Sequence, residues 1–128
     1  MITHELAEQL QGAGLPWEPQ PGDRFVIPTP DLKREVFVVS NMTIEVREEI
    51  GGPLITFNGT TEWALDSIPA SRVLWLPRED QLRTALGEQF SRLEVLPDGF
   101  VVVLDDGRRA ADIDAERAYA RAVLMTLG

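Results

Sequence analysis

The sequence predicts a single α+β domain, in which antiparallel hairpins and a meander pack with N-terminal, central and C-terminal helices. Three observations predict this class. Helical periodicity occurs in three separated segments. Short apolar runs between them are divided by turn residues. Helices and strands do not alternate as they would in a parallel α/β fold. At 128 residues the chain has the size of one domain, so we expect residues 1–128 to form one unit.

The first helix is expected at residues 2–13, where Ile2, Leu6 and Leu10 recur one helical turn apart. Acidic and amide side chains occupy the remaining surface of this helix. The segment after it contains three prolines between residues 16 and 21, which exclude a regular helix. Because this segment also carries Trp17, we expect an ordered crossover that lays the indole ring on the core.

Three strands are expected in the next part of the chain. Residues 24–27 form the first, and residues 36–39 are so uniformly apolar that they predict a strand in the middle of a sheet. Strict alternation of apolar and polar residues from Thr43 to Glu49 predicts a strand with one face in water.

A hairpin is expected around Asn58-Gly59, the dipeptide typical of a two-residue type I′ turn. The flanking residues 54–57 and 60–65 are rich in β-branched, aromatic and aliphatic side chains, which favours strands. A helix at residues 60–68 is the alternative interpretation. We prefer the strand because the turn dipeptide would otherwise be unexplained.

A brief buried strand at residues 73–76 leads into a short central helix at residues 78–87. Pro77 has the backbone angle that suits a helix start, and the acidic residues Glu79 and Asp80 face the positive end of the helix dipole. Gly87 is a natural stop.

The last third of the chain predicts a three-stranded meander at residues 93–96, 100–104 and 108–112, divided by a Pro-Asp-Gly and an Asp-Gly turn. A final helix follows, and Asp112 or Asp114 caps its N-terminus. The order helix, sheet, helix, sheet, helix favours antiparallel pairing.

Composition limits the class of protein and its partners. The chain contains no cysteine, which excludes disulfides and thiolate zinc sites. The N-terminus lacks the basic residues of a signal peptide, and no apolar run spans a bilayer, so we expect a cytoplasmic protein. Its net charge of −9 repels phosphate groups, so we expect neither nucleic acid nor membrane as a partner. A protein partner, and a monomer or homodimer, are expected.

No recognised catalytic constellation is present. His4 is the only histidine, and it lies in the first turn of a helix, so no base is positioned for a nucleophile. Neither a dinucleotide-binding fingerprint nor a Walker A loop occurs. We therefore expect no catalytic residue, no metal ligand and no cofactor.

Acidic residues near the C-terminus could bind a hard cation such as Ca²⁺ or Mg²⁺. The candidates are Asp105, Asp106, Asp112, Asp114 and Glu116. A turn and a helix N-terminus account for them without a metal, and we prefer that interpretation.

Four residues are candidates for binding a ligand or a protein partner: Trp17, Glu62, Trp63 and Asp66. The two acids bracket Trp63 as a carboxylate pair beside an aromatic wall, which glycosidases use. On one strand they would stand about 13 Å apart at ~3.3 Å per residue, beyond the usual glycosidase separations. A solvated strand face explains the two acids better. The tryptophans form either an aromatic interaction surface or part of the core, and both interpretations stay open.

Several stretches resemble a known family: residues 14–17, 21–25, 58–67 and 74–82. The family comprises small acidic proteins of this length from GC-rich, actinobacterial-type bacteria, often labelled automatically as pilus assembly proteins. The resemblance implies a recurring small cytosolic protein and brings no catalytic residue or cofactor with it. The ATPase activity that the label suggests is not expected, because the chain has no Walker A loop.

Three functions are expected from these observations. The first is a non-enzymatic binding or adaptor domain that holds a protein or small ligand near Trp17 and Trp63. The second is a hydrolase or isomerase that uses carboxylates, with Glu62 and Asp66 acting beside Arg78. The third is an acidic inhibitor or immunity-type protein that neutralises a basic partner.

Overall fold

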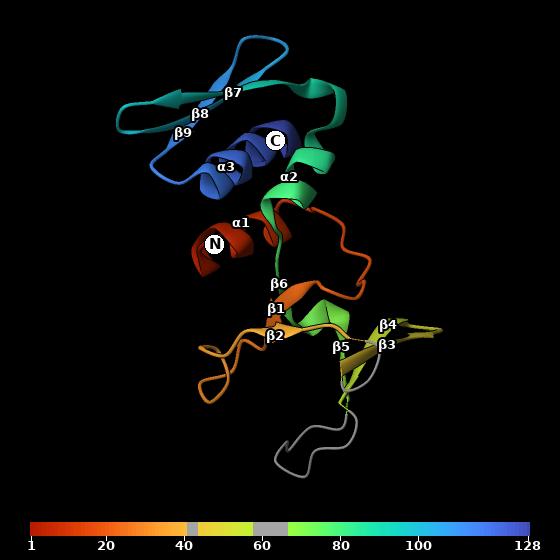
Figure 1. Cartoon of the computed structure of the whole chain (residues 1–128). Coiled ribbons are helices and arrows are strands. Elements are labelled where there is room, and N and C mark those ends of the chain that lie inside the picture. Colours follow the sequence, from red (N-terminus) through yellow and green to blue (C-terminus); the bar gives the residue numbers. More distant parts are fainter. Residues whose placement is uncertain (41–43, 58–66) are drawn as a thin grey trace. The chain divides into compact units, whose positions relative to one another are not determined.

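The computed structural model describes residues 1–40, 44–57 and 67–128, which fold into helices and three small antiparallel sheets (Figure 1). The predicted α+β class is confirmed. The chain divides into two compact units. The helical unit comprises residues 1–15 and 77–128, and the β unit comprises residues 16–76. The expectation of one domain over residues 1–128 stays a prediction.

The three predicted helices are present in the helical unit as α1 (His4–Gly12), α2 (Glu79–Leu86) and α3 (Ala115–Leu127). At the start of each helix a side chain accepts a hydrogen bond from a backbone N–H group. The Thr3 hydroxyl accepts from the Leu6 N–H at 3.1 Å. The Arg78 N–H donates to the Gln81 side chain at 2.9 Å. Asp114, rather than Asp112, is the N-cap of α3.

The predicted meander is also confirmed, as β7 (Phe90–Leu96), β8 (Gly99–Leu104) and β9 (Arg109–Asp112) in the order β7-β8-β9. Val102 of β8 pairs with Leu93 of β7 and with Ala110 of β9. Helix α3 packs along β8 and β9 (Figure 1). Val102 and Leu104 are buried there, so the core of this unit lies between the meander and α3.

The opposite side of β8 carries Val101 and Val103, which are each only 4% exposed. Ion pairs lie across this face of the sheet: the Glu94 carboxylate accepts from Arg92 and from Arg109, both at 2.8 Å. These hydrogen bonds, that from Arg109 first, hold the pKa of Glu94 below its ordinary value. Arg92 and Arg109 both lie opposite Val103 in the strand register, on this same face.

The first sheet of the β unit contains β1 (Arg24–Val26), β2 (Phe37–Val38) and β6 (Leu74–Leu76) in the order β2-β1-β6. The prediction that residues 36–39 lie in the middle of a sheet is wrong, because β2 is an edge strand. Val36 and Val38 are 39% and 48% exposed, while Phe37 points into the core. An uninterrupted apolar run therefore does not distinguish a central strand from an edge strand.

The second sheet contains β3 (Ile44–Glu49), β4 (Gly52–Phe57) and β5 (Ser67–Pro69) in the order β3-β4-β5. Residues 44–49 of the predicted strand at 43–49 form β3, Thr43 falls outside the described residues, and the predicted strand at residues 54–57 lies within β4. The Asn58-Gly59 turn and the strand at residues 60–65 fall outside the described residues.

The predicted pairing of the Asn58-Gly59 hairpin is wrong. A two-residue turn would place Thr61 opposite Thr56, but Thr56 pairs with Ser67 on one side and with Glu45 on the other. Both sides of β4 are therefore occupied by β3 and β5.

One core joins the two sheets of the β unit. It consists of Phe25, Ile27, Phe37, Val39, Ile55, Phe57, Ala70 and Val73. Within it, the rings of Phe25 and Phe37 lie 5.5 Å apart, and those of Phe37 and Phe57 lie 6.1 Å apart. Ala70 belongs to a short 3₁₀ helix (Ala70–Arg72) between β5 and β6. No helix among the described residues has the length and apolar character needed to cross a membrane.

Candidate functional site

A buried carboxylate organises the proline-rich crossover before β1. Asp23 is only 1% exposed, and its Oδ2 atom accepts from the Trp17 indole N–H at 2.9 Å and from the Gln20 backbone N–H at 3.0 Å. The Asp23 carbonyl also accepts from the Val39 N–H at 2.9 Å. Because an acceptor without donors is costly to bury, this network holds the loop in one conformation.

The ring of Trp17 stacks on that of Trp75, with the centroids 5.8 Å apart and the planes 7° from parallel. Trp17 also lies against Phe25 at 6.3 Å, so the prediction that the crossover lays this ring on the core is confirmed. Both tryptophans are half-buried. The indole N–H of Trp75 is buried and has no hydrogen-bond acceptor among the described residues.

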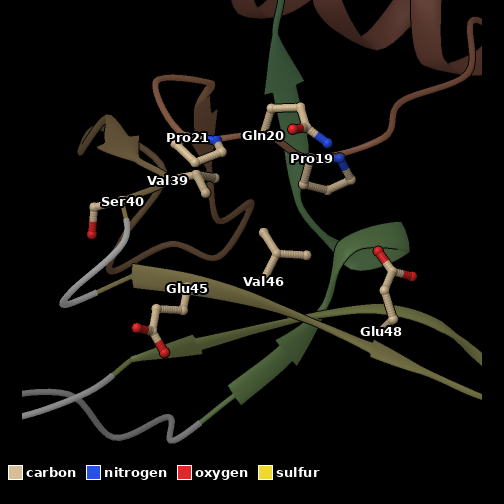
Figure 2. A pocket seen from close by; sticks show the side chains of 8 residues that line it. All are labelled: Pro19, Gln20, Pro21, Val39, Ser40, Glu45, Val46 and Glu48. Carbon is tan, nitrogen blue, oxygen red and sulfur yellow. The ribbon is translucent and has the colours of Figure 1, made fainter.

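A pocket of about 370 Å³ opens between this loop, the end of β2 and strand β3 (Figure 2). The residues that line it are Pro19, Gln20, Pro21, Val39, Ser40, Glu45, Val46 and Glu48. Figure 2 shows Val46 and Glu48 projecting from one side of β3 toward Pro19, while Glu45 turns to the other side. The lining of the pocket is therefore mixed: its exposed surface is more polar than apolar, with Val46 and the prolines beside carboxylates.

The electrostatic character of the pocket is acidic. Glu45 and Glu48 line it, and none of the lining residues is basic. On the neighbouring positions of the same strand, Arg47 pairs with Glu49 at 3.5 Å. Because side chains alternate along a strand, this pair lies on the side of β3 opposite to Glu48. Glu48 forms no ion pair with any residue in the ranges 1–40, 44–57 and 67–128.

The structure places only part of the predicted site. Trp17 does not line the pocket, but it is linked to the pocket residue Gln20 through Asp23. Glu62, Trp63 and Asp66 fall outside the described residues, so their predicted roles stay predictions. Arg78, the third member of the carboxylate-enzyme hypothesis, pairs with Asp80 at 3.1 Å.

Sequence reasoning missed the residues that form the pocket, chiefly Gln20, Val46 and Glu48. One signal was available: the alternation over residues 43–49 places Val46 on the inner face of β3, and Glu48 follows two positions later on that face. Glu48 is an exposed carboxylate that continues the face on which Val46 lies.

Two of the five acidic residues that are candidate cation ligands, Asp106 and Asp112, form ion pairs with arginines. Asp112 binds the guanidinium groups of Arg117 and Arg121 at 2.9 Å each. Asp106 binds Arg108 at 2.7 Å. Within the described residues, no three His, Asp or Glu side chains are grouped so that they could hold a metal ion. Ion pairs, together with a turn and a helix cap, account for these carboxylates.

No protein-family model, curated protein or solved structure matches this chain. The resemblance to small acidic proteins of GC-rich bacteria therefore stays a prediction. The residues of the pocket are the basis for proposing a function.

Proposed function

We propose that this chain is a non-enzymatic binding or adaptor protein that holds a protein or small ligand in the pocket beside β3. The observation that carries the proposal is the pre-formed loop: the buried Asp23 carboxylate and two prolines hold one wall of the pocket in place. A pre-organised wall lowers the entropy lost on binding, which favours affinity.

The polar groups of the pocket support binding better than catalysis. The Ser40 hydroxyl already accepts from the Ile44 N–H at 3.0 Å, and no histidine lines the pocket to activate it as a nucleophile. The alternative of a carboxylate hydrolase or isomerase depends on Glu62 and Asp66, and it stays an untested hypothesis.

A second candidate function is an acidic inhibitor or immunity-type protein with a basic partner. Glu45 and Glu48 in the pocket favour it, as does the net charge of −9. For both candidates we propose a cytoplasmic protein, monomeric or homodimeric, that binds neither nucleic acid nor membranes. The net charge supports this choice of partners.

The test blocks the pocket without disturbing its wall. Gln20 has an exposed side chain and lines the pocket, so Gln20→Trp should fill the space while the backbone N–H still donates to Asp23. Glu18→Trp, on the same loop but outside the pocket, is the matched control.

The measurement is a screen of a fragment library and of random peptides against the full chain, by thermal shift and NMR. We expect ligands that bind the wild type and Glu18→Trp and lose affinity for Gln20→Trp. If no fragment or peptide distinguishes Gln20→Trp from its control, the pocket is not a binding site and the proposal fails.

A further inference from the structure

Strand β3 is an end strand of its sheet, and its outer edge borders the pocket. At the start of this edge, Ile44 donates its N–H to the Ser40 hydroxyl at 3.0 Å, and its carbonyl accepts the Ser40 N–H at 2.6 Å. Backbone groups of an antiparallel strand turn to alternate sides. Val46 and Glu48 therefore direct their N–H and C=O groups to the same outer side as Ile44.

The loop across the pocket does not complete this edge. Pro19 and Pro21 have no N–H to donate, and the N–H of Gln20 is already given to Asp23. In the part of the chain that the structure describes, no group bonds to the outer backbone of Val46 or Glu48. Such an open edge is a template for another extended chain.

The side chains beside this edge indicate which kind of residue a bound segment would place in the pocket. Val46, Val39 and Pro19 contribute apolar groups to a lining that is otherwise polar, and Glu48 projects beside them without a cation (Figure 2). An arginine or lysine side chain fits this combination, since its aliphatic stem can lie on the apolar groups while its charged head reaches a carboxylate.

We propose that the occupant of the pocket is an extended segment of a partner protein that adds to the outer edge of β3 and places an arginine or lysine side chain against Glu48. This inference rests on the proposed function and names the partner's chemistry. Backbone hydrogen bonds from Val46 and Glu48 provide affinity, and the Glu48 carboxylate provides selectivity.

The test uses a display library of random octapeptides, selected against the full chain at low salt. We expect the selected peptides to share one arginine or lysine. Synthetic copies should bind Glu48→Gln about tenfold more weakly, since a hydrogen bond to a charged acceptor is stronger than one to a neutral amide. Glu49→Gln removes the same charge from the opposite side of β3 and should leave the affinity unchanged.

Hydrogen exchange supplies a second readout that a purely electrostatic contact would not change. Bound peptide should slow exchange of the Val46 and Glu48 amides, while the Arg47 amide, which faces β4, should respond less. A basic peptide that binds without protecting the two outer amides would overturn the strand-addition part of the inference.

Three other outcomes contradict the inference. Selected peptides without a basic residue, equal binding to Glu48→Gln and Glu49→Gln, or no selected peptide would each overturn it. Glu48→Gln could also self-associate in sedimentation while its peptide binding stays unchanged. That result would overturn the inference and show that the Glu48 carboxylate prevents strand pairing between copies of this chain. If fragments still distinguish Gln20→Trp from Glu18→Trp, the proposed function stands while the strand-adding partner is rejected.

Discussion

The indole N–H of Trp17 donates to the Asp23 carboxylate at 2.9 Å, and the oxygen that accepts it also accepts the Gln20 backbone N–H at 3.0 Å. One buried oxygen thus orients both an aromatic ring and a wall of the pocket. Because the Trp17 ring stacks on Trp75 in β6, the same contact connects the crossover loop to the sheet. The shape of the pocket and the stability of the β unit should therefore depend on Asp23.

Replacing Asp23 tests this dependence. Asp23→Ala leaves two donors without their acceptor, and we expect the free energy of unfolding to fall by about 2–3 kcal/mol. Urea unfolding followed by tryptophan fluorescence measures the loss. The exposed residue Glu18 on the same loop gives the control Glu18→Ala, which should change stability by less than about 0.5 kcal/mol. A loss for Asp23→Ala no larger than that of the control would show that other contacts hold the loop.

The stack of Trp17 on Trp75 should contribute a measurable coupling. In a double-mutant cycle of Trp17→Leu and Trp75→Leu, we expect an interaction energy of about 0.5–1.5 kcal/mol, the range of stacked aromatic pairs. Ile50 has a fully exposed side chain, so Ile50→Ala combined with Trp17→Leu should be additive. Additivity in both cycles would contradict a specific contribution from the stack.

The helices and strands of the helical unit were predicted well because the sequence patterns that indicate them lie within each segment or between neighbouring segments. Apolar residues one turn apart predict α1 and α3, and Gly87 predicts the end of α2, where it adopts a φ of 55°. Turn residues likewise predict the meander, in which consecutive strands are neighbours. None of these features requires knowledge of distant parts of the chain.

Strand order in the β unit could not be predicted in this way. Strand β1 pairs with β6, roughly fifty residues later in the chain, as in the pair Phe25 and Trp75. Tertiary packing, rather than composition, places β1 in the centre and β2 at the edge. The Asn58-Gly59 signal predicted a local partner for β4, whereas β3 and β5 occupy its two sides.

The candidate site was predicted only through Trp17. Asp23 follows Pro21-Gly22, where an aspartate is typical of an exposed turn, so the sequence does not mark it as buried. Glu48 stands among other acids in a strand with one face in water. It acquires its role because the loop at Pro19 and Pro21 lies beside that strand, which is a tertiary relationship.

A close backbone approach should make Gly99 irreplaceable at the start of β8. A Cβ atom at this position would lie 2.8 Å from the Asp112 carbonyl oxygen in β9. We expect Gly99→Ala to lower the free energy of unfolding by about 1–3 kcal/mol, because a strand must move to relieve the overlap. Thermal and urea unfolding provide the measurement.

The matched control for Gly99 is Gly12, the last residue of α1, where an added Cβ would meet no atom within 4 Å. Gly12→Ala should leave stability unchanged or raise it by up to about 1 kcal/mol, since alanine loses less backbone entropy in a helix. Equal effects of the two substitutions would show that the β8–β9 contact can relax without cost.

Asp112 should make stability depend on pH. It accepts the Arg117 and Arg121 side chains at 2.9 Å each. Burial alone would raise the pKa of Asp112, but hydrogen bonds from Arg121 and the Asp114 backbone outweigh burial and hold that pKa below its ordinary value. The unfolded chain, with a pKa of about 3.9 at this position, takes up a proton first as the pH falls. The stabilisation is therefore present above about pH 3.9 and lost as the pH falls through the folded pKa.

Asp112→Asn removes the charge and keeps the size of the side chain, so it isolates this contribution. At pH 6 we expect the variant to be less stable by about 2 kcal/mol, because two arginines lose a charged acceptor. The difference from wild type should shrink as urea unfolding is repeated at pH values that fall below about 3.9 and through the folded pKa, where the wild-type carboxylate is also neutralised. Asp98→Asn, at an exposed turn position in the same unit, should follow the wild type at every pH. A difference for Asp112→Asn that stays constant down to pH 2 would assign the effect to altered packing and contradict the ion-pair explanation.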